Sequence, residues 1–262
     1  MTAAVETETG STTVTAEAAV RLTKVGKTFR DGGAPVLEGI DLSVAPGEFV
    51  CLLGASGCGK STLLNLIADL DKPSGGTVDV PSGRAALMFQ ESALVPWLSA
   101  GANIDLALRL RGRSGKRERR AEAERLLELV RLRGAYDKRP HQLSGGMRQR
   151  VALARALAQD SKVLLMDEPF AALDAITRDV LHEELIRLWE TTGLAVVFVT
   201  HNVREAVRLG QRVVLLSSRP GRVAHEWYVD IPQPRRVEDK AVADLSVEIT
   251  DHLRQEISRH GR

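Results

Sequence analysis

The sequence has no long apolar run, few cysteines and almost no net charge, and each absence excludes a class of protein. No apolar run approaches the ~18 residues that a membrane-spanning helix requires. Two cysteines among 262 residues do not make a disulfide framework, and they favour a reducing compartment. A formal net charge of +2 creates no global field that would attract nucleic acid.

The length and the first residues set further limits. At 262 residues the chain can form one large domain or two small ones with a substantial core. Residues 1–20 are rich in Thr, Ala and Glu, and they lack the basic start and apolar centre of a secretion signal. We therefore expect a soluble, cytosolic chain in which residues 1–18 form a disordered tail.

One glycine-rich segment lies between an apolar run at 49–53 and a leucine-rich run at 63–70. It matches the phosphate-loop pattern G-x-x-x-x-G-K-[ST], in the strand–loop–helix context that this motif requires. The alternative is a glycine-rich turn that carries Lys-Ser by chance. We expect a nucleoside triphosphate to contact Gly54, Ala55, Ser56, Gly57, Cys58, Gly59, Lys60, Ser61 and Thr62.

The chemistry of this segment suits phosphate. Its glycines let backbone N–H groups point at an anion that the N-terminus of the next helix also faces. Lys60 can reach the terminal phosphates, and the Ser61 hydroxyl can coordinate Mg²⁺. The thiol of Cys58 lies in the same surroundings, which predict a lowered pKa, reaction with alkylating agents and protection by MgATP. Cys51, on the preceding strand, better fits a buried, unreactive thiol.

Two apolar runs further along the chain end in polar residues, as buried parallel strands do where they meet a ligand. Residues 163–166 lead into Asp167 and Glu168, and residues 195–200 lead into His201. We predict that Asp167 binds Mg²⁺, directly or through water, and that Glu168 polarises the attacking water. The alternative is a strand end with solvated acids. His201 alone would be structural, and only the pattern makes it a candidate γ-phosphate contact.

A third segment, residues 143–147, opens a helix that extends through residue 157. Ser144 is a favourable N-cap, and Gly145 and Gly146 leave the N–H groups of the first turn uncovered. The sequence therefore predicts a second anion site at a helix N-terminus, this time without a lysine.

Taken together, these motifs resemble the ATP-binding subunit of an ABC transporter, over about residues 19–230. The segment at 143–147 resembles the family's Leu-Ser-Gly-Gly-Gln signature, with Met147 in place of glutamine. The resemblance implies a P-loop NTPase of the α/β class that uses ATP and Mg²⁺. It also implies an adenine-stacking aromatic, a glutamine near the metal and the reaction, and an acid near a dimer seam, at Phe29, Gln90 and Asp174.

Two residues depart from the family's usual pattern without placing ATP binding in doubt. Phe29 replaces the more usual tyrosine, and stacking on a base survives the loss of a hydroxyl. Asp69 replaces a glycine near the end of the helix after the phosphate loop, where a left-handed conformation is often needed. Asp adopts that conformation better than most residues.

Three details resemble the nitrate, sulfonate and taurine group of importers. They are Met147, the Val-Pro-Trp stretch at 95–97 shortly after Gln90, and the Ser-Ser-Arg-Pro-Gly-Arg-Val stretch at 217–223. The likeness implies a cargo of small oxyanions or sulfonates and a region around Trp97 that meets the membrane subunit. For Trp97 the alternative is an aromatic that packs a surface loop.

The strand and helix patterns outline the fold. Residues 19–50 alternate as strands do, residues 91–160 read mainly as helices, and strand–helix alternation returns after residue 161. We therefore expect a mainly parallel sheet core with an antiparallel β subdomain and a helical subdomain at about 91–160. A helical extension at 231–262 would pack on its own domain through Leu245, Ile249, Leu253 and Ile257.

The resemblance also implies a head-to-tail homodimer in which each signature segment closes over the ATP that the other subunit binds. Ser144 and Gly146 would contact the partner's γ-phosphate, and hydrolysis would let the subunits separate. The implied partners are integral membrane permease subunits and, through them, an extracytoplasmic substrate-binding protein, with no nucleic acid. The chain would lie peripherally on the cytoplasmic face of the cell membrane.

Two other classes of ABC protein remain as alternatives. A soluble ATPase that acts on DNA or ribosomes would carry a long coiled coil or two cassettes, whereas the interval from Gln90 to Leu143 holds only a small helical insertion. Acids follow the arginines at 109–120, as on a solvated helix face. The second alternative is an exporter ATPase. Co-purification with a permease and an extracytoplasmic binding protein would distinguish the two transport functions.

Overall fold

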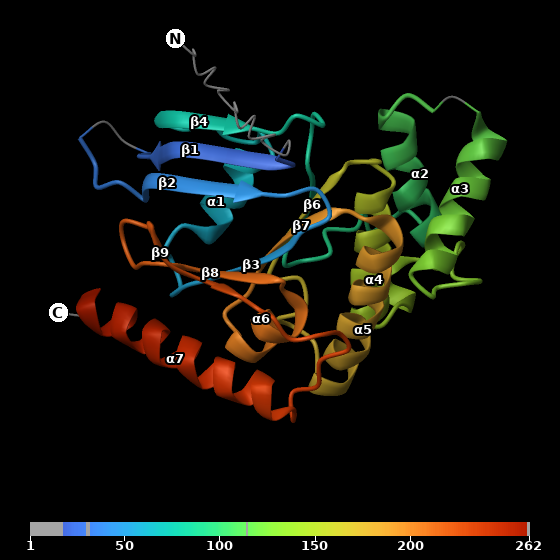
Figure 1. The fold of residues 1–262 in the computed structure, drawn as a ribbon. Coiled ribbons are helices and arrows are strands. Elements are labelled where there is room, and N and C mark those ends of the chain that lie inside the picture. The colour runs from blue at the N-terminus through green and yellow to red at the C-terminus, as the bar shows by residue number, and fades with distance from the viewer. Residues whose placement is uncertain (1–17, 30–31, 114, 261–262) are drawn as a thin grey trace, which may run out of the picture.

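The computed structural model describes residues 18–29, 32–113 and 115–260, which form two β-sheets with helices between and beside them (Figure 1). The tail expected at 1–18 lies outside the described residues except for Ala18, which is buried.

The larger sheet has six strands in the order β5-β6-β7-β3-β8-β9. Its neighbours pair in parallel except at one edge, where β9 is antiparallel to β8. All residues of β3, β7 and β8 are buried, because other elements cover both faces of the sheet. The strands are β3 (Phe49–Leu53), β5 (Ala86–Met88), β6 (Val163–Asp167), β7 (Ala195–Val199), β8 (Arg212–Leu216) and β9 (Val223–Tyr228).

A smaller, antiparallel sheet lies above the larger one, with its strands in the order β2-β1-β4 (Figure 1). Its strands are β1 (Val20–Lys27), β2 (Leu37–Val44) and β4 (Gly75–Asp79). Helix α1 (Lys60–Ile67) runs between the two sheets, and Asp69 just beyond its end adopts the predicted left-handed conformation, with φ +59°. The parallel core and the antiparallel sheet confirm the expected α/β fold class.

The helices pack beside and beneath the larger sheet. Helices α2 and α3 lie at one side and pack against α4, α4 and α5 run next to each other, and α7 crosses below α6 (Figure 1). None of the helices in the described ranges is both long and apolar enough to cross a membrane. The helices are α2 (Ala100–Leu110), α3 (Lys116–Leu129), the 3-10 helix η1 (Pro140–Gln142), α4 (Gly145–Leu157), α5 (Ala175–Thr192), α6 (Val203–Leu209) and α7 (Lys240–His260).

Helix α7 packs on its own domain, as its apolar face predicted. Ile249 is fully buried, and Leu245 and Leu253 pack against the same core cluster, whereas Ile257 is about half exposed. The buried guanidinium of Arg235 ties the preceding segment down by donating to backbone carbonyls, including that of Val207 at the end of α6.

Two apolar clusters lie on opposite faces of the larger sheet, and β3 serves both. Phe49, Cys51 and Leu53 face the helices, while Val50 and Leu52 face α1 and the smaller sheet. With β3, β6 and β7 fixed in parallel, the loops after their carboxyl ends meet along one edge of the sheet. That edge carries most of the candidate functional residues.

Candidate functional site

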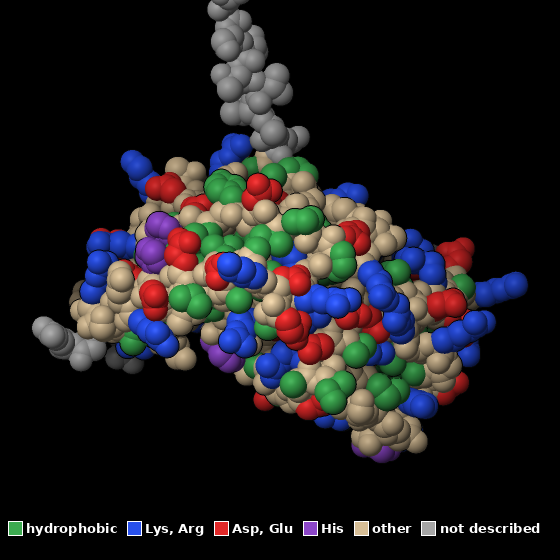
Figure 2. Space-filling view, turned by 60° about the horizontal axis from the view of Figure 1, so that its bottom comes forward, with side chains coloured by type: hydrophobic (Ala, Val, Ile, Leu, Met, Phe, Trp, Pro, Cys, Tyr) green, Lys and Arg blue, Asp and Glu red, His purple; other side chains and the backbone are tan. Residues whose placement is uncertain are grey.

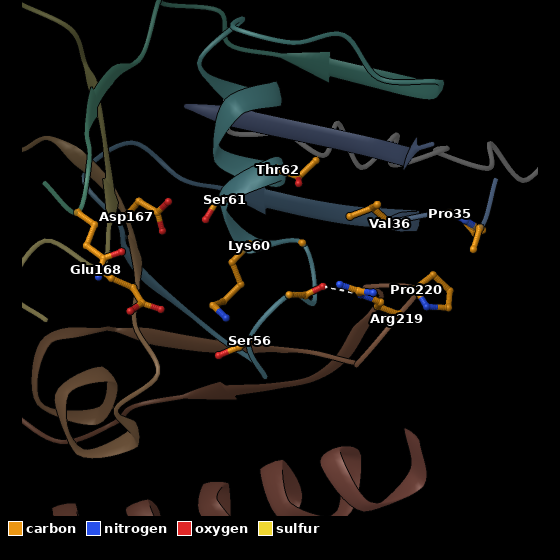
Figure 3. Close-up of a pocket in the computed structure, with 14 residues that line it drawn as sticks. Pro35, Val36, Ser56, Lys60, Ser61, Thr62, Asp167, Glu168, Arg219 and Pro220 are labelled. Carbon is orange, nitrogen blue, oxygen red and sulfur yellow. Dashed lines mark hydrogen bonds between the residues drawn. The ribbon is translucent and has the colours of Figure 1, made fainter. Parts of the chain in front are cut away.

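A cavity of about 630 Å³ opens at this edge, between the loop after β3 and the acids that follow β6 (Figure 3). It brings together most of the predicted phosphate-loop and strand-end residues. Its lining consists of Ala34, Pro35, Val36, Ser56, Gly57, Gly59, Lys60, Ser61, Thr62, Gln90, Asp167, Glu168, Arg219 and Pro220.

The loop after β3 turns into α1 through glycines in left-handed conformations. Gly57 has φ +76° and Gly59 has φ +104°, and a Cβ on Gly59 would lie 2.6 Å from the Cδ2 of Leu37. Gly59 is the N-cap of α1, and no side chain caps the first turn. The N–H groups of that turn therefore stay available to an anion.

The ammonium group of Lys60 is buried beside this turn without a counter-ion among its partners. The residue is 6% exposed, and its Nζ donates to the carbonyl oxygens of Gly54 (2.9 Å) and Ala55 (3.0 Å). A third, weaker contact is to the Sγ of Cys58 at 3.9 Å. The hydrogen-bond partners of this buried cation are neutral, and Asp167 acts on it only through space. A buried charge without a directly paired counter-ion is costly, so the arrangement favours an anion in the cavity.

Asp167 ends β6 on the opposite side of the cavity from Arg219, next to Ser61 (Figure 3). Burial raises the pKa of the Asp167 carboxyl, which the Ser61 hydroxyl lowers by hydrogen bonding and the nearby Glu168 raises again. A hydroxyl and a carboxylate beside a phosphate site are the oxygen ligands that Mg²⁺ takes, with waters and phosphates completing its shell. The residues present therefore fit this ion.

Glu168 has a strained backbone. Its φ of +43° is uncommon for any residue other than glycine, and such strain concentrates at functional sites. The N–H of Glu168 donates to the carbonyl of Val199 (3.1 Å), and its Oε2 lies 2.9 Å from the Nδ1 of His201. The two residues predicted at the ends of β6 and β7 thus meet, although His201 does not itself line the cavity.

Gln90 follows β5 and lines the cavity, and its loop is tied to α4. The carbonyl of Gln90 accepts a hydrogen bond from the Nε2 of Gln149 (2.8 Å). Arg155, also on α4, donates to the carbonyls of Ser92 (2.9 Å) and Ala93 (2.6 Å). Helix α4 therefore holds this loop by hydrogen bonds that the sequence did not predict.

The segment predicted as a second anion site forms the start of α4. Ser144 is the N-cap, and its Oγ accepts from the N–H of Met147 at 3.2 Å. A Cβ on Gly146 would lie 2.6 Å from the Cγ2 of Thr177, so the start of α4 packs closely on α5. Asp174 in turn caps α5 through the N–H of Thr177 (2.9 Å). The cavity that holds Lys60 is lined by none of Ser144, Gly145, Gly146 and Asp174.

Phe29 lies just beyond the end of β1 and is 62% exposed. The Nζ of Lys27 lies 5.0 Å from its ring centre. Phe29 does not line the cavity, and residues 30–31, which follow it, lie outside the described ranges. Its stacking on a base stays a prediction.

The lowered pKa that the sequence predicts for Cys58 is wrong, and with it the reason for expecting a reactive thiol. Burial raises the pKa of the Cys58 thiol, and the lowering effects of Lys60 and the backbone are smaller. The side chain is 2% exposed and does not line the cavity. A buried thiol with a raised pKa stays protonated near neutral pH and reacts slowly. Cys51 is buried in β3 with its pKa also raised by burial, as expected of an unreactive thiol.

Two parts of the cavity wall were not predicted from the sequence. One is the segment 34–36 before β2, and the other is Arg219 with Pro220 on the loop between β8 and β9. In the sequence, the loop with Arg219 and Pro220 was singled out only because it resembles that of a group of importers. No local pattern could indicate that this loop lies against the phosphate loop, because the two are 162 residues apart where they touch.

Comparisons with known proteins agree with this geometry. A family model described as ABC transporter matches residues 37–171. The nitrate import ATP-binding protein NrtD of Synechocystis sp. is 44% identical, over 81% of this chain and 83% of its own. The taurine import ATP-binding protein TauB of Pseudomonas savastanoi pv. phaseolicola is 44% identical, over 81% and 84%. The bicarbonate transport ATP-binding protein CmpC of Synechocystis sp. is 46% identical over 90% of this chain, which spans only 38% of that relative.

A solved structure agrees in fold as well. An ATP-binding cassette determined as a dimer in a post-hydrolysis state, bound to ADP and Pi, has a TM-score of 0.72 and 35% identity. The match covers 81% of this chain and all of the other. The family model includes the phosphate loop, Gln90, Asp167 and Glu168, and the two import relatives each cover 81% of the chain. The chain therefore belongs to the ABC transporter family, as one of its ATP-binding ATPases.

Proposed function

We propose that this chain is the ATP-hydrolysing subunit of an importer for small oxyanions or sulfonates. Relatives similar to it are named for the import of nitrate and taurine and for the transport of bicarbonate. The observation that carries the ATPase assignment is the buried ammonium of Lys60, whose partners are uncharged, at the uncapped N-terminus of α1. A polyphosphate supplies the negative charge that this site lacks.

The phosphate loop would hold the nucleotide chiefly through its backbone. Residues 54–62 would surround the phosphates, and Lys60 would exchange its carbonyl partners for phosphate oxygens. Phe29 would stack on the adenine from the end of β1. Ser61, Asp167 and Gln90 would hold Mg²⁺, which neutralises phosphate charge when bound.

Glu168 would accept a proton from the attacking water. Its strained backbone and its contact with His201 would fix the direction of the carboxylate, which matters because a general base must lie within hydrogen-bond reach of its proton. His201 would reach the γ-phosphate beside it, and Gln90 would help to position the water.

A second copy of the chain would complete each site. Ser144, Gly145, Gly146 and Asp174 lie at the adjoining starts of α4 and α5, outside the cavity of their own chain. Close by on α5, Ile176 is 79% exposed, an apolar side chain that a partner subunit would cover. The dimeric state of the similar solved cassette supports a homodimer, for which the proposed arrangement is head-to-tail.

The proposed location is the cytoplasmic face of the membrane, in a complex with permease subunits and through them with an extracytoplasmic substrate-binding protein. Trp97 is 74% exposed on the loop that α4 holds, which suits a contact with the permease. On the face in Figure 2, Lys and Arg side chains are interspersed with Asp and Glu. That face offers no support for binding nucleic acid, which favours a continuous basic stripe.

The test of the ATPase uses Glu168→Gln, which keeps the size of the side chain and removes its charge. We expect kcat to fall by about 10²–10⁴-fold while MgATP still binds. The variant should accumulate as an ATP-bound dimer in size-exclusion chromatography, because hydrolysis is what opens the dimer. Asp167→Asn should instead lose Mg²⁺-dependent binding.

Glu190→Gln, which changes an exposed glutamate on α5, is the matched control and should hydrolyse ATP normally. Normal hydrolysis by Glu168→Gln would overturn the catalytic assignment. A Glu168→Gln variant that is inactive and binds MgATP but never dimerises would overturn the proposed ATP-driven dimerisation. The cargo is tested separately, by uptake of nitrate, bicarbonate and taurine in vesicles that contain the permease complex.

A further inference from the structure

The loop between β8 and β9, residues 217–222, forms a closed turn on the phosphate loop. The N–H of Ser217 donates to the carbonyl of Arg222 (2.9 Å), and its hydroxyl donates to that of Pro220 (2.8 Å). Gly221 donates to the carbonyl of Val36 (2.8 Å). A Cβ on Gly221 would lie 2.2 Å from the carbonyl oxygen of Cys58, so the turn and the phosphate loop are in direct backbone contact.

This contact directs Arg219 into the cavity. Its Nε donates to the carbonyl oxygen of Gly57 at 3.2 Å, and the residue lines the same cavity as Lys60. Figure 3 shows the guanidinium beside the phosphate loop, at the end of the cavity next to Pro35 and Val36. One hydrogen bond to a carbonyl leaves most of the five N–H donors of an arginine for other partners. Because Arg219 lines the cavity, these donors are available to a ligand bound there.

The two ends of the cavity differ in chemistry. Asp167 and Glu168 lie at one end, across Lys60 and Ser61 from Arg219 (Figure 3). A nucleoside triphosphate whose terminal phosphate faces the two acids extends its remaining phosphates and ribose toward the other end. An arginine there meets phosphate oxygens, to which its positive charge and its free N–H donors can bind.

We propose that Arg219 is a second cationic ligand of the nucleotide and binds oxygens of the phosphates nearer the ribose. The inference rests on the proposed function, because it takes the cavity to be the ATP site. It assigns to the stretch 217–222 a direct part in nucleotide affinity. Arg219 also holds the phosphate loop through Gly57, so a ligand role must be separated from a merely structural one.

Two substitutions make that separation. Arg219→Gln keeps an N–H donor for the carbonyl of Gly57 and removes the positive charge, whereas Arg219→Lys keeps both a donor and the charge. The matched control is Arg222→Gln, on the same loop, because the Arg222 side chain pairs with Glu38 at 2.8 Å and does not line the cavity.

The experiment is calorimetric titration of each variant with MgATP and with MgADP, beside the melting temperature of the nucleotide-free protein. We expect Arg219→Gln to weaken both nucleotides about tenfold, the size of one charge-assisted hydrogen bond. Arg219→Lys should recover most of the affinity, and Arg222→Gln should bind as the unaltered protein does. The melting temperatures of the three variants should agree.

Three results would overturn the inference: unchanged affinity in Arg219→Gln, a loss in Arg219→Lys as large as in Arg219→Gln, or a loss confined to MgATP. The last would mean that Arg219 serves only the terminal phosphate. Failure of the proposed function looks different, because the unaltered chain would then bind no MgATP at all. A different result would reject only the inference about Arg219. In that case the unaltered chain binds MgATP, the Lys60→Ala variant does not, and the Arg219→Gln variant binds it with unchanged affinity.

Discussion

The starts of α1 and α4 are both glycine-containing helix N-termini, yet they are built in opposite ways. Helix α1 begins after Gly59, in a left-handed conformation and without a side-chain cap, and a buried Lys60 lies beside it. Helix α4 is capped by its own Ser144 and packs closely on Thr177. The N-terminus of α1 has no side-chain cap and lies beside a buried positive charge, whereas the N-terminus of α4 is capped by Ser144.

The difference teaches what each terminus can bind alone. Open N–H groups and an ammonium whose hydrogen-bond partners are neutral attract a phosphate without help from another chain. A terminus that has a side-chain cap and no lysine is a weaker anion site. The start of α4 therefore suits a phosphate that is already bound elsewhere and is brought to it by a partner subunit.

The largest expected effect separates the two termini directly. Lys60→Ala should weaken MgATP binding by about 2–5 kcal/mol, because it removes the cation that faces the phosphates. Ser144→Arg should leave that affinity nearly intact and still abolish hydrolysis, because it adds bulk and charge where the proposed dimer places the partner's γ-phosphate. Equilibrium binding and phosphate release, with Lys72→Ala as an exposed control, make the measurement.

Mixed dimers of altered and unaltered subunits sharpen this result, since one Ser144→Arg subunit should leave one site unobstructed. If Ser144→Arg lost ATP affinity as severely as Lys60→Ala, the assignment of the two termini to different subunits would be wrong.

The second prediction concerns the glycines. Gly59→Ala should lower the free energy of unfolding by about 2–4 kcal/mol, because it forces φ +104° on an L-residue and crowds Leu37. Gly146→Ala should cost about 1–3 kcal/mol, because its new methyl meets only the Cγ2 of Thr177. Thr177→Ser removes that methyl and should restore stability to Gly146→Ala in urea unfolding. Failure of this rescue would contradict the packing described for α4.

The third prediction concerns the adenine that Phe29 is proposed to contact. Phe29→Ala should weaken ATP binding by about 1–3 kcal/mol through lost stacking and should raise KM more than it lowers kcat. Tyr228→Ala, which changes another exposed aromatic residue, on β9, is the control and should have no effect on KM. An unchanged KM in Phe29→Ala would remove Phe29 from the site.

The smallest effect tests the cap itself. Ser144→Ala should lower stability by about 1 kcal/mol, since the N–H of Met147 loses its acceptor. Ser144→Asp should keep that stability, because Asp also caps well, and yet reduce hydrolysis by repelling the partner's phosphate. Thermal unfolding and phosphate release measure the two effects, and normal hydrolysis by Ser144→Asp would show that no phosphate approaches this terminus.

Local motifs made much of the fold and site predictable. The phosphate loop, the acids after β6 and the Ser144 cap each depend on a few consecutive residues in one strand, loop or helix. Strand β4 was missed because its Gly-Gly-Thr-Val-Asp segment is mostly exposed and carries little apolar alternation.

Residues whose role depends on distant packing were not predictable. The neighbours of Cys58 in sequence suggested a lowered pKa, but the surrounding fold buries the thiol and raises the pKa instead. Arg219 lines the cavity from a loop whose Gly221 fits against the backbone of Cys58, a contact between segments that lie far apart in the sequence. The spacing of residues in the sequence predicts neither the burial of Cys58 nor the position of Arg219.

The three hydrogen bonds from α4 to the loop after β5 have a mechanical consequence. Gln149 and Arg155 donate hydrogen bonds to the carbonyls of Gln90, Ser92 and Ala93. A tilt of this helix would therefore either move the loop or break these hydrogen bonds. We therefore expect a displacement of α4 to shift the loop at the cavity rim, which continues a few residues further to the exposed Trp97. Through these hydrogen bonds, a change at the start of α4 and a change at Trp97 are expected to affect each other.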